Sequence, residues 1–292
     1  MAIAESELIL NKDGSIYHLN LKPEHLAQTI ITVGDPDRVD QVTQYFDTIE
    51  CKIRKREFHT QTGIYKGHRI TVISTGIGTD NIDIVCNELD ALVNIDLITR
   101  KNKIEHTTLH IIRIGTSGSI QPDIPIDSFV VSEIATGFDS LLHFYKSLHV
   151  QLPEISEALA KHIDLDQNKS KPYTVAYDKK LGEHMLSNTV QKGHTVTNVG
   201  FYGPQGRVLR LPLQDQELNT KIASFVYGDK KITNLEMETA GIYGLAKLLG
   251  HKAVSMNAIV ANRATGEFSQ NPKETVEKLI KYTLDKIASY HP

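Results

Sequence analysis

The feature that most constrains the fold is a recurring unit: a short apolar run rich in β-branched residues, often followed by glycine and then a helical pattern. Such runs occur at residues 29–33, 70–75, 109–114, 129–132, 195–199 and 253–260. Short apolar runs that alternate with helical patterns are typical of strands covered by helices on both faces. We therefore predict an α/β fold, a three-layer αβα sandwich.

Two helices are clearly marked by their spacing. Within residues 81–97, the apolar residues Ile82, Val85, Cys86, Leu89 and Val93 recur every three or four positions, which predicts one face packed on the sheet. The last helix should begin after Asn271, with Pro272 in its first turn. We find no linker, repeat or shift in composition, so residues 1–292 are predicted to form a single domain.

Composition excludes several classes of function. The 32 basic and 35 acidic residues give a net charge of -3, which offers no general attraction for nucleic acid or an anionic membrane. Two cysteines, no long apolar run and no basic segment before the first apolar patch predict a cytoplasmic protein without disulfides. None of the thirteen histidines stands in an HExxH motif, and we predict no metal and no cofactor.

Three predicted strand ends carry glycine beside basic or hydroxyl residues: VGDPDR at 33–38, STGIGTDN at 74–81 and IRIGTSGSIQP at 112–122. Ligands of open α/β sheets gather at the carboxyl ends of strands, where Arg38, Arg113 and Thr116 could donate hydrogen bonds to phosphate oxygens. Each motif alone is also compatible with an ordinary turn. Arg113 lies inside an apolar run and needs a partner, which could be a phosphate or an internal carboxylate.

Two further segments suggest a nucleoside. In NLEMETAG, Glu236 and Glu238 are two residues apart, a spacing that suits a vicinal diol but also suits acids at a helix N-terminus. In GFYGPQGR at 200–207, Gln205 and Arg207 together match the carbonyl, N–H, carbonyl edge of an imide. The alternative is a plain Gly/Pro loop.

Taken in this order, the motifs resemble the purine/uridine type of nucleoside phosphorylase family, most closely its uridine-cleaving members. The resemblance rests on GDPDR, REF at 56–58, STGIG, RIGTSGSIQP, FYGPQGR, EMETA and NR at 262–263, and it covers nearly the whole chain. It implies a mixed, largely parallel twisted sheet and a pentosyltransferase that converts uridine and phosphate to uracil and ribose 1-phosphate. Inorganic phosphate would be a co-substrate.

The resemblance also implies roles for individual residues. The phosphate set comprises Gly34, Arg38, Arg113, Thr116 and, from a neighbouring subunit, Arg56. The ribose set comprises Glu236, Met237, Glu238 and the neighbour's His18. The base set comprises Phe201, Gln205, Arg207 and Val260. Catalysis would rest on Arg113, Gln205, Arg207 and Glu238. A homodimer would then be the smallest active unit, commonly assembled as a hexamer, a trimer of dimers.

Alternatives within and outside the fold stay open. Purine-cleaving members generally have an aspartate where this chain has Asn262 and Arg263, which favours uracil. A nucleoside hydrolase would lack the full arginine set, and a non-catalytic nucleoside sensor could lose it. The monovalent cation site of some bacterial uridine-cleaving members is matched at Glu57 and Ile77 but not at Asn81, so we predict no bound potassium.

Overall fold

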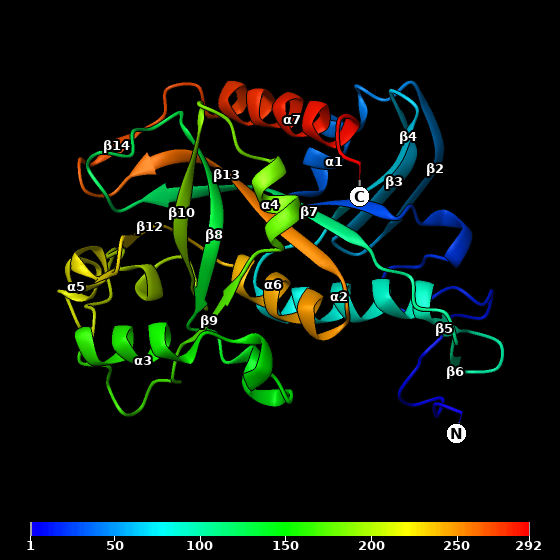
Figure 1. Ribbon diagram of the computed structural model, residues 1–292, viewed down its shortest axis with the longest axis horizontal. Coiled ribbons are helices and arrows are strands. Elements are labelled where there is room, and N and C mark those ends of the chain that lie inside the picture. Colours follow the sequence, from blue (N-terminus) through cyan, green and yellow to red (C-terminus); the bar gives the residue numbers. More distant parts are fainter. Residues whose placement is uncertain (1, 292) are drawn as a thin grey trace.

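The computed structural model describes residues 2–291, and its ribbon is shown in Figure 1. The strands are β1 (Thr29–Val33), β2 (Thr48–Lys55), β3 (Phe58–Tyr65), β4 (His68–Ser74), β5 (Ile95–Asp96), β6 (Lys101–Asn102), β7 (His110–Ser119), β8 (Phe129–Gly137), β9 (Tyr173–Ala176), β10 (Val190–Thr197), β11 (Val226–Tyr227), β12 (Lys230–Glu236), β13 (Lys252–Asn262) and β14 (Glu267–Phe268). The helices are α1 (Pro36–Thr43), α2 (Thr79–Asn94), α3 (Pro153–His162), α4 (Lys179–His184), α5 (Leu218–Ser224), α6 (Thr239–Leu248) and α7 (Pro272–Ala288).

One large mixed sheet organises these elements in the order β11-β12-β10-β8-β13-β7-β1-β4-β3-β2. The pairs β10–β12, β10–β8, β13–β7, β1–β7 and β1–β4 are parallel. β12 also pairs with β7, so that β12, β10, β8, β13 and β7 close into a ring. β4, β1, β7 and β13 run in one direction, and β8, β10 and β12 form a second parallel group that runs the opposite way. Within the first group, the carboxyl ends of β1 and β4 meet at one edge, where ligands bind in open α/β sheets.

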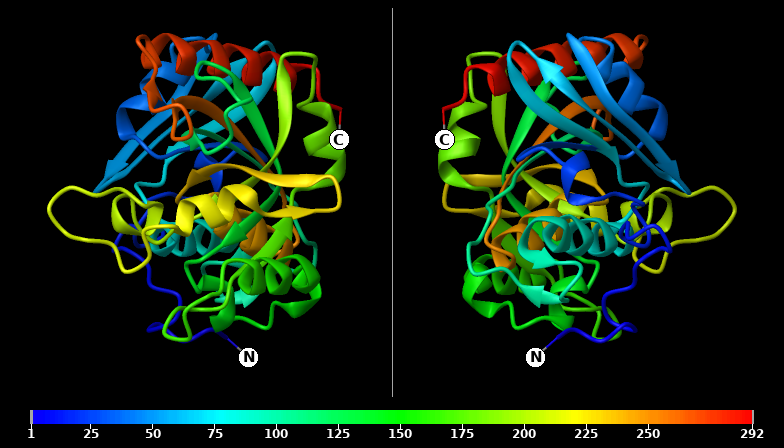
Figure 2. Two further views of the ribbon diagram at one scale, coloured as in Figure 1. Left: turned by 90° about the vertical axis from the view of Figure 1, so that its left-hand side faces the viewer. Right: turned by 90° about the vertical axis from the view of Figure 1, so that its right-hand side faces the viewer.

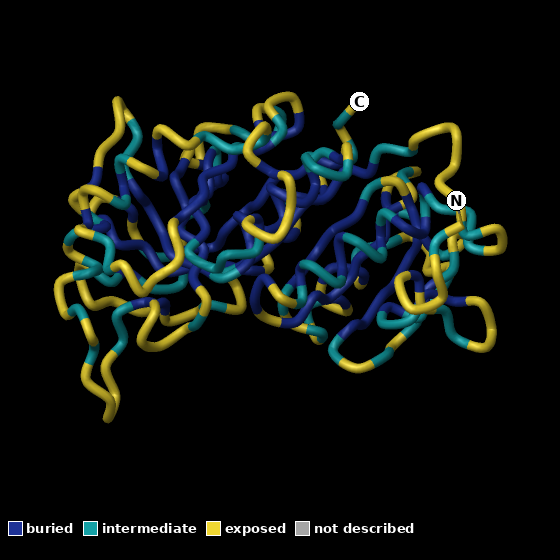
Figure 3. Tube along the Cα trace, turned by 90° about the horizontal axis from the view of Figure 1, so that it is seen from below, coloured by how far each residue is buried: buried dark blue, intermediate teal, exposed yellow. Residues whose placement is uncertain are grey.

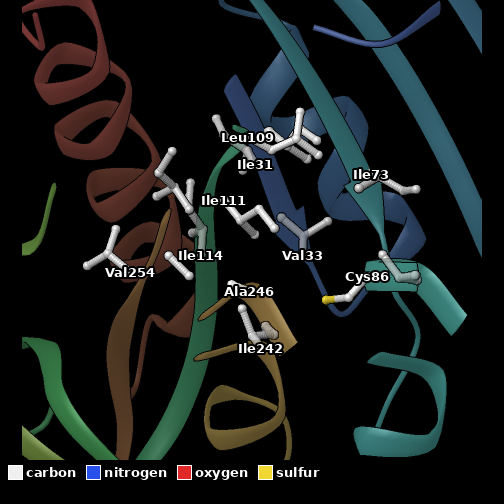
Figure 4. Packing of buried hydrophobic residues seen from close by; sticks show 14 of the residues in the cluster. Ile31, Val33, Ile73, Cys86, Leu109, Ile111, Ile114, Ile242, Ala246 and Val254 are labelled. Atoms are coloured by element: carbon white, nitrogen blue, oxygen red, sulfur yellow. The ribbon is translucent and has the colours of Figure 1, made fainter. Parts of the chain in front are cut away.

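Helices cover both faces of the sheet. In Figures 1 and 2, α7 and α1 lie on one side, and α2 and α6 lie together on the other. Figure 4 shows the packing between layers, with Ile31 and Val33 of β1 and Ile111 of β7 near Ile242 of α6 and Cys86 of α2. A second cluster lies beneath α3 and α5. The predicted three-layer αβα sandwich is therefore confirmed.

The predicted elements are present with some changes in length. All six predicted strands occur, as β1, β4, β7, β8, β10 and β13, and β7 and β8 extend well beyond the predicted ends. The apolar stripe of the last helix is buried, and the helix begins at Pro272. No helix within residues 2–291 combines the length and the apolar character that a membrane crossing needs.

Candidate functional site

The ends of β1, β4 and the middle of β7 come together at the carboxyl edge of the sheet. Thr32 of β1 pairs with Arg113 of β7, and Val33 pairs with Ser74 of β4. The loop after β4 lies against Gly34, where an added Cβ would stand 3.5 Å from the Gly76 carbonyl oxygen. The first two glycine motifs and Arg113 therefore share one location, as the sequence predicts.

Arg113 is buried in an ion pair. Its Nη2 lies 2.6 Å from Glu238 Oε2 and 3.2 Å from Glu236 Oε2, and its Nη1 donates to Asn257 Oδ1 at 3.1 Å. Burial by itself would lower the pKa of Arg113, but the two carboxylates raise it overall. Of the two partners that the sequence left open, the structure contains the internal carboxylate.

Arg38 supplies a second guanidinium group beside the first. It lies at the start of α1 and is half-buried, and its Nη1 donates weakly to the Ile114 carbonyl oxygen at 3.4 Å. Burial and the like charge of Arg113 lower its pKa. No ion pair between Arg38 and a carboxylate occurs within residues 2–291. A half-buried cation next to another cation, without a carboxylate of its own, is an arrangement that favours a bound anion.

Glu236 and Glu238 converge on Arg113 but differ in what they can still bind. Glu236 accepts hydrogen bonds from Thr197 Oγ1, from the Glu238 and Thr239 backbone N–H groups and from Thr239 Oγ1, besides the contact with Arg113. These contacts fill its lone pairs, and burial raises its pKa. The ribose role predicted for Glu236 therefore finds no vacant acceptor, because this carboxylate holds the N-terminus of α6.

Glu238 keeps acceptor capacity. Its Oε1 accepts from the Gly78 backbone N–H at 2.9 Å, and its Oε2 accepts from Arg113. Each carboxylate oxygen has a further lone pair, which a sugar hydroxyl could use. Met237, between the two glutamates, is partly exposed, as is Thr116 of β7. Glu238 therefore links three elements: the loop that follows β4, the strand β7 and the start of α6. We call Gly78, Arg113, Glu236 and Glu238 the Arg113 cluster.

Three of the four predicted base residues, Phe201, Gln205 and Arg207, form a compact unit. The Arg207 guanidinium carbon lies 3.8 Å from the centre of the Phe201 ring, and Arg207 Nη1 donates to Gln205 Oε1 at 2.8 Å and to the Phe201 carbonyl oxygen at 2.6 Å. Burial and nearby Arg263 lower the pKa of Arg207. One face of Phe201 is thereby covered by Arg207, so a base could stack only on the other. With its Oε1 engaged, Gln205 presents its Nε2 as a donor.

Arg263 is a residue of the site to which sequence reasoning gave no role. It follows β13, and its Nη1 and Nη2 donate to the Gln205 and Gly206 carbonyl oxygens at 3.0 and 3.2 Å. Its own backbone N–H donates to the Ser119 carbonyl oxygen at the end of β7. Arg263 therefore links the loop 201–207, which we call the base loop, to the sheet. The NR motif at residues 262–263 is the feature of the sequence that could have indicated a role for Arg263.

The remaining predicted residues lie in two places. Val260 is half-buried in β13, near its end. His18 contacts Glu88 at 2.7 Å, and exposed Arg56 lies 5.9 Å from the Tyr17 ring centre. Neither His18 nor Arg56 forms a hydrogen bond or ion pair with the Arg113 cluster in the part of the chain that the structure describes. Within one chain, these two residues form a separate surface group.

Two groups of residues bear on metal binding. Near Gly76, the Asn81 amide faces the Ile77 carbonyl oxygen at 3.5 Å, and Glu57 lies on the same side. Elsewhere, Asp90, His106 and His251 place ligand atoms within 4.8 Å of one another. The Leu109 N–H donates to His251 Nδ1 at 3.2 Å, so the neutral ring carries its proton on Nε2, which faces Asp90 Oδ1 at 3.2 Å. That protonated nitrogen is not a metal ligand.

Comparison with known proteins agrees with this geometry. Residues 28–288 match the family model of the phosphorylase superfamily. A uridine phosphorylase of Thermococcus kodakarensis is 29% identical over 267 residues, which cover 89% of this chain and 82% of that protein. A purine nucleoside phosphorylase of the DeoD type from Thermoanaerobacter pseudethanolicus is 27% identical over 272 residues, or 92% and 97% of the two chains.

A solved structure shows the same similarity. The structure of a Trypanosoma brucei nucleoside phosphorylase, described as showing uridine phosphorylase activity, matches with a TM-score of 0.85 at 28% identity. The match covers 97% of this chain and 100% of that one.

Proposed function

The chain belongs to the phosphorylase superfamily, and on that premise we propose that it catalyses the reversible phosphorolysis of uridine to uracil and ribose 1-phosphate. The observation that carries the proposal is the guanidinium group of half-buried Arg38 beside that of buried Arg113, at the carboxyl edge of the sheet. Arg38 has no carboxylate partner among the described residues. A phosphate ion supplies the missing negative charge.

The reaction follows from this placement. A phosphate oxygen bonds to C1′ of the ribose as the C1′–N1 bond breaks, and the electron pair of that bond leaves with uracil. The transition state carries positive charge on the sugar, as in other glycosyl transfers. Arg38, Arg113, Thr116 and the Gly34 backbone hold the phosphate beneath C1′. The chain contributes positioning and electrostatic stabilisation, without a covalent intermediate.

The sugar and the base have separate contacts. Glu238 accepts hydrogen bonds from the ribose hydroxyls, with Met237 packed beside the sugar. Because Glu238 also binds Arg113, ribose and phosphate are recognised by one connected network. Gln205 Nε2 and the remaining N–H groups of Arg207 donate to the uracil carbonyl oxygens, where negative charge develops as the base departs.

The choice of uridine over a purine nucleoside rests on two observations. Gln205 and Arg207 are linked at 2.8 Å and leave donors for a uracil edge. Asn262 and Arg263 stand in the segment where purine-cleaving members generally have an aspartate, and the Asn262 amide donates to the Gln121 and Ile124 carbonyl oxygens, which holds it away from a base. Purine nucleoside phosphorylase is the second candidate, because relatives of that name cover 92% of the chain.

We further propose that the site is completed by a second copy of the chain. Arg56 is exposed on the turn between β2 and β3 and has a left-handed backbone, with φ 55°. Tyr17 links it to His18 in one surface group. In a homodimer this group reaches the partner's phosphate and ribose 5′-hydroxyl, and such dimers can assemble further into a hexamer.

A substrate panel tests the proposal. Uridine, thymidine, inosine and adenosine are each incubated with and without phosphate, and the free base is measured. We expect uracil release from uridine only with phosphate, and slower or no release from the purine nucleosides. Equal uridine cleavage without phosphate would identify a hydrolase, faster inosine cleavage would identify a purine enzyme, and binding without turnover would identify a sensor.

A further inference from the structure

A large cavity lies beside the base loop, outside the nucleoside site. Its volume is about 880 Å³, which is within the range of small-molecule sites. Its apolar lining comes from the end of β8, from α5 and from the segment 207–215, and includes Phe138, Leu209, Leu211, Leu213, Leu218 and Ile222. The loop 201–207 contributes Tyr202, Gly203, Pro204 and Arg207 to the lining, whereas none of the predicted phosphate and ribose residues lines it. The cavity is therefore a separate space that shares one wall with the base loop.

The outer wall is apolar yet exposed. Leu209 and Leu211 are 75% and 80% exposed, and the yellow-green loop that carries them projects from the body in Figure 2. Seen from below, Figure 3 likewise shows an exposed loop that reaches away from the buried centre. An apolar surface of this kind, arranged around a hollow, is typical of a ligand site.

The charged residues at the cavity are cationic. Lys169, Arg207 and Arg210 line it, and none of the three forms an ion pair with a carboxylate in residues 2–291. The one acidic residue of the lining, Asp215, is neutralised by Lys221 at 2.9 Å. The cavity thus offers positive charge around an apolar interior.

A buried donor also lines the cavity. Asn198, at the end of β10, is only 4% exposed, and its Nδ2 has no hydrogen-bond partner within the described chain. That nitrogen is shielded from solvent, so an occupant of the cavity can accept from it only if the side chain turns. The cations Lys169, Arg207 and Arg210 of the lining favour an occupant with a negatively charged, hydrogen-bond-accepting group.

We propose that this cavity binds an amphipathic organic anion, one per chain, with its apolar body among Phe138, Leu213 and Ile222 and its anionic group near Lys169 and Arg210. A medium-chain carboxylate has this chemistry. The site is distinct from the nucleoside site, so it stands even if the reaction proposed above is wrong.

Calorimetric titration of the full chain tests the proposal, with decanoate and decyltrimethylammonium as probes below their micellar concentrations. The two probes have the same apolar chain and opposite charge. We expect decanoate to bind saturably at one per chain, and at least tenfold more tightly than the cation. Removing two cations in the variant Lys169→Ala/Arg210→Ala should weaken decanoate binding at least tenfold, because both residues face the anionic group.

The control variant is Lys101→Ala/Arg54→Ala, which removes two exposed cations from β6 and β2, away from the cavity. It should bind decanoate like the parent. Absence of saturable decanoate binding would overturn the proposal. So would equal affinity for the two probes, or equal weakening in the test and control variants, since either result would mean that chain length or total charge, rather than this cavity, governs binding.

Discussion

Glycine at position 115 determines where the Arg113 guanidinium can lie. A Cβ added at Gly115 would stand 1.8 Å from Arg113 Nη1 and 2.3 Å from its guanidinium carbon. The atoms that would have to move are the end of a flexible side chain, and the backbone of Gly115 does not have a positive φ. Alanine at this position should therefore displace the guanidinium without preventing folding.

We predict that Gly115→Ala lowers kcat for uridine phosphorolysis by roughly two to three decades, the usual effect of losing one donor to developing charge. Steady-state kinetics with varied phosphate would measure it. The matched control is Gly118→Ala in the same strand, where the nearest atoms lie 3.8 Å away; it should behave like the parent. Parent-like kinetics in Gly115→Ala would show that Arg113 has no part in the reaction.

His194 provides a prediction about stability and pH. It is buried and contacts Thr136 Oγ1 at 2.7 Å, and burial, with a smaller effect from Lys230, lowers its pKa to about 3. Between its ordinary value of 6.5 and about 3, only the unfolded chain binds this proton. Stability from this group is therefore present above pH 6.5 and is lost as the pH falls toward 3, by up to about 1.4 kcal/mol per pH unit.

We expect the free energy of unfolding to fall less between pH 7 and pH 5 in His194→Gln than in the parent, by about 2 kcal/mol. Urea unfolding at a series of pH values would measure the slopes. His149→Gln, at an exposed histidine, should keep the parent slope. An unchanged slope in His194→Gln would mean that the pKa of this ring is the same in the folded and unfolded chain, and would contradict the shift caused by burial.

At the scale of elements, the loop 201–207 depends on β13. Arg263 bonds the Gln205 and Gly206 carbonyl oxygens through both terminal nitrogens. Hydrogen bonds to a charged group are worth about 1.5 kcal/mol or more. We predict that Arg263→Ala raises KM for uridine roughly tenfold, with less effect on KM for phosphate, which binds at other strands. Steady-state kinetics would separate the two constants.

In Arg263→Lys the side chain can donate to only one of the two carbonyl oxygens at a time. This variant should therefore restore part of the affinity for uridine that Arg263→Ala loses. The control Arg54→Ala removes an exposed cation from β2 and should change neither constant. If Arg263→Ala raised both KM values alike, the residue would support the fold in general and not the base loop in particular.

Elements whose burial follows from apolar residues could be predicted from the sequence. β1, β4 and β7 are such strands. Because β1 pairs with both β4 and β7, Gly34 and Arg113 lie near the same edge of the sheet. β3 could not be predicted because its buried residues are polar: Gln61 bonds Asp40 and Thr43, and Thr62 bonds Thr71. These partners come from other elements. The occupied oxygens of Glu236 were unpredictable for the same reason.

At the scale of the whole molecule, the surface group of His18 and Arg56 is separate from the Arg113 cluster, which predicts complementation between chains. Arg56→Ala and Arg113→Ala should each be nearly inactive alone. When they are co-expressed with different tags, half of the dimers are mixed, and one site in each mixed dimer is intact. We expect about a quarter of the parent activity, measured on the purified mixture.

Co-expression of Arg113→Ala with itself under both tags is the control, and it should stay inactive. Activity no higher than the mean of the two separate variants would show that Arg56 serves its own chain, or no site at all.

The most direct test of the central claim, that Arg38 and Arg113 hold phosphate as the nucleophile, is an isotope experiment. Uridine is incubated with the enzyme in ordinary water and phosphate labelled with ¹⁸O at all four oxygens, and the sugar product is analysed by mass spectrometry. We predict ribose 1-phosphate that keeps all four labelled oxygens, one of them bonded to C1′. Free ribose carrying an unlabelled oxygen from water would contradict the account.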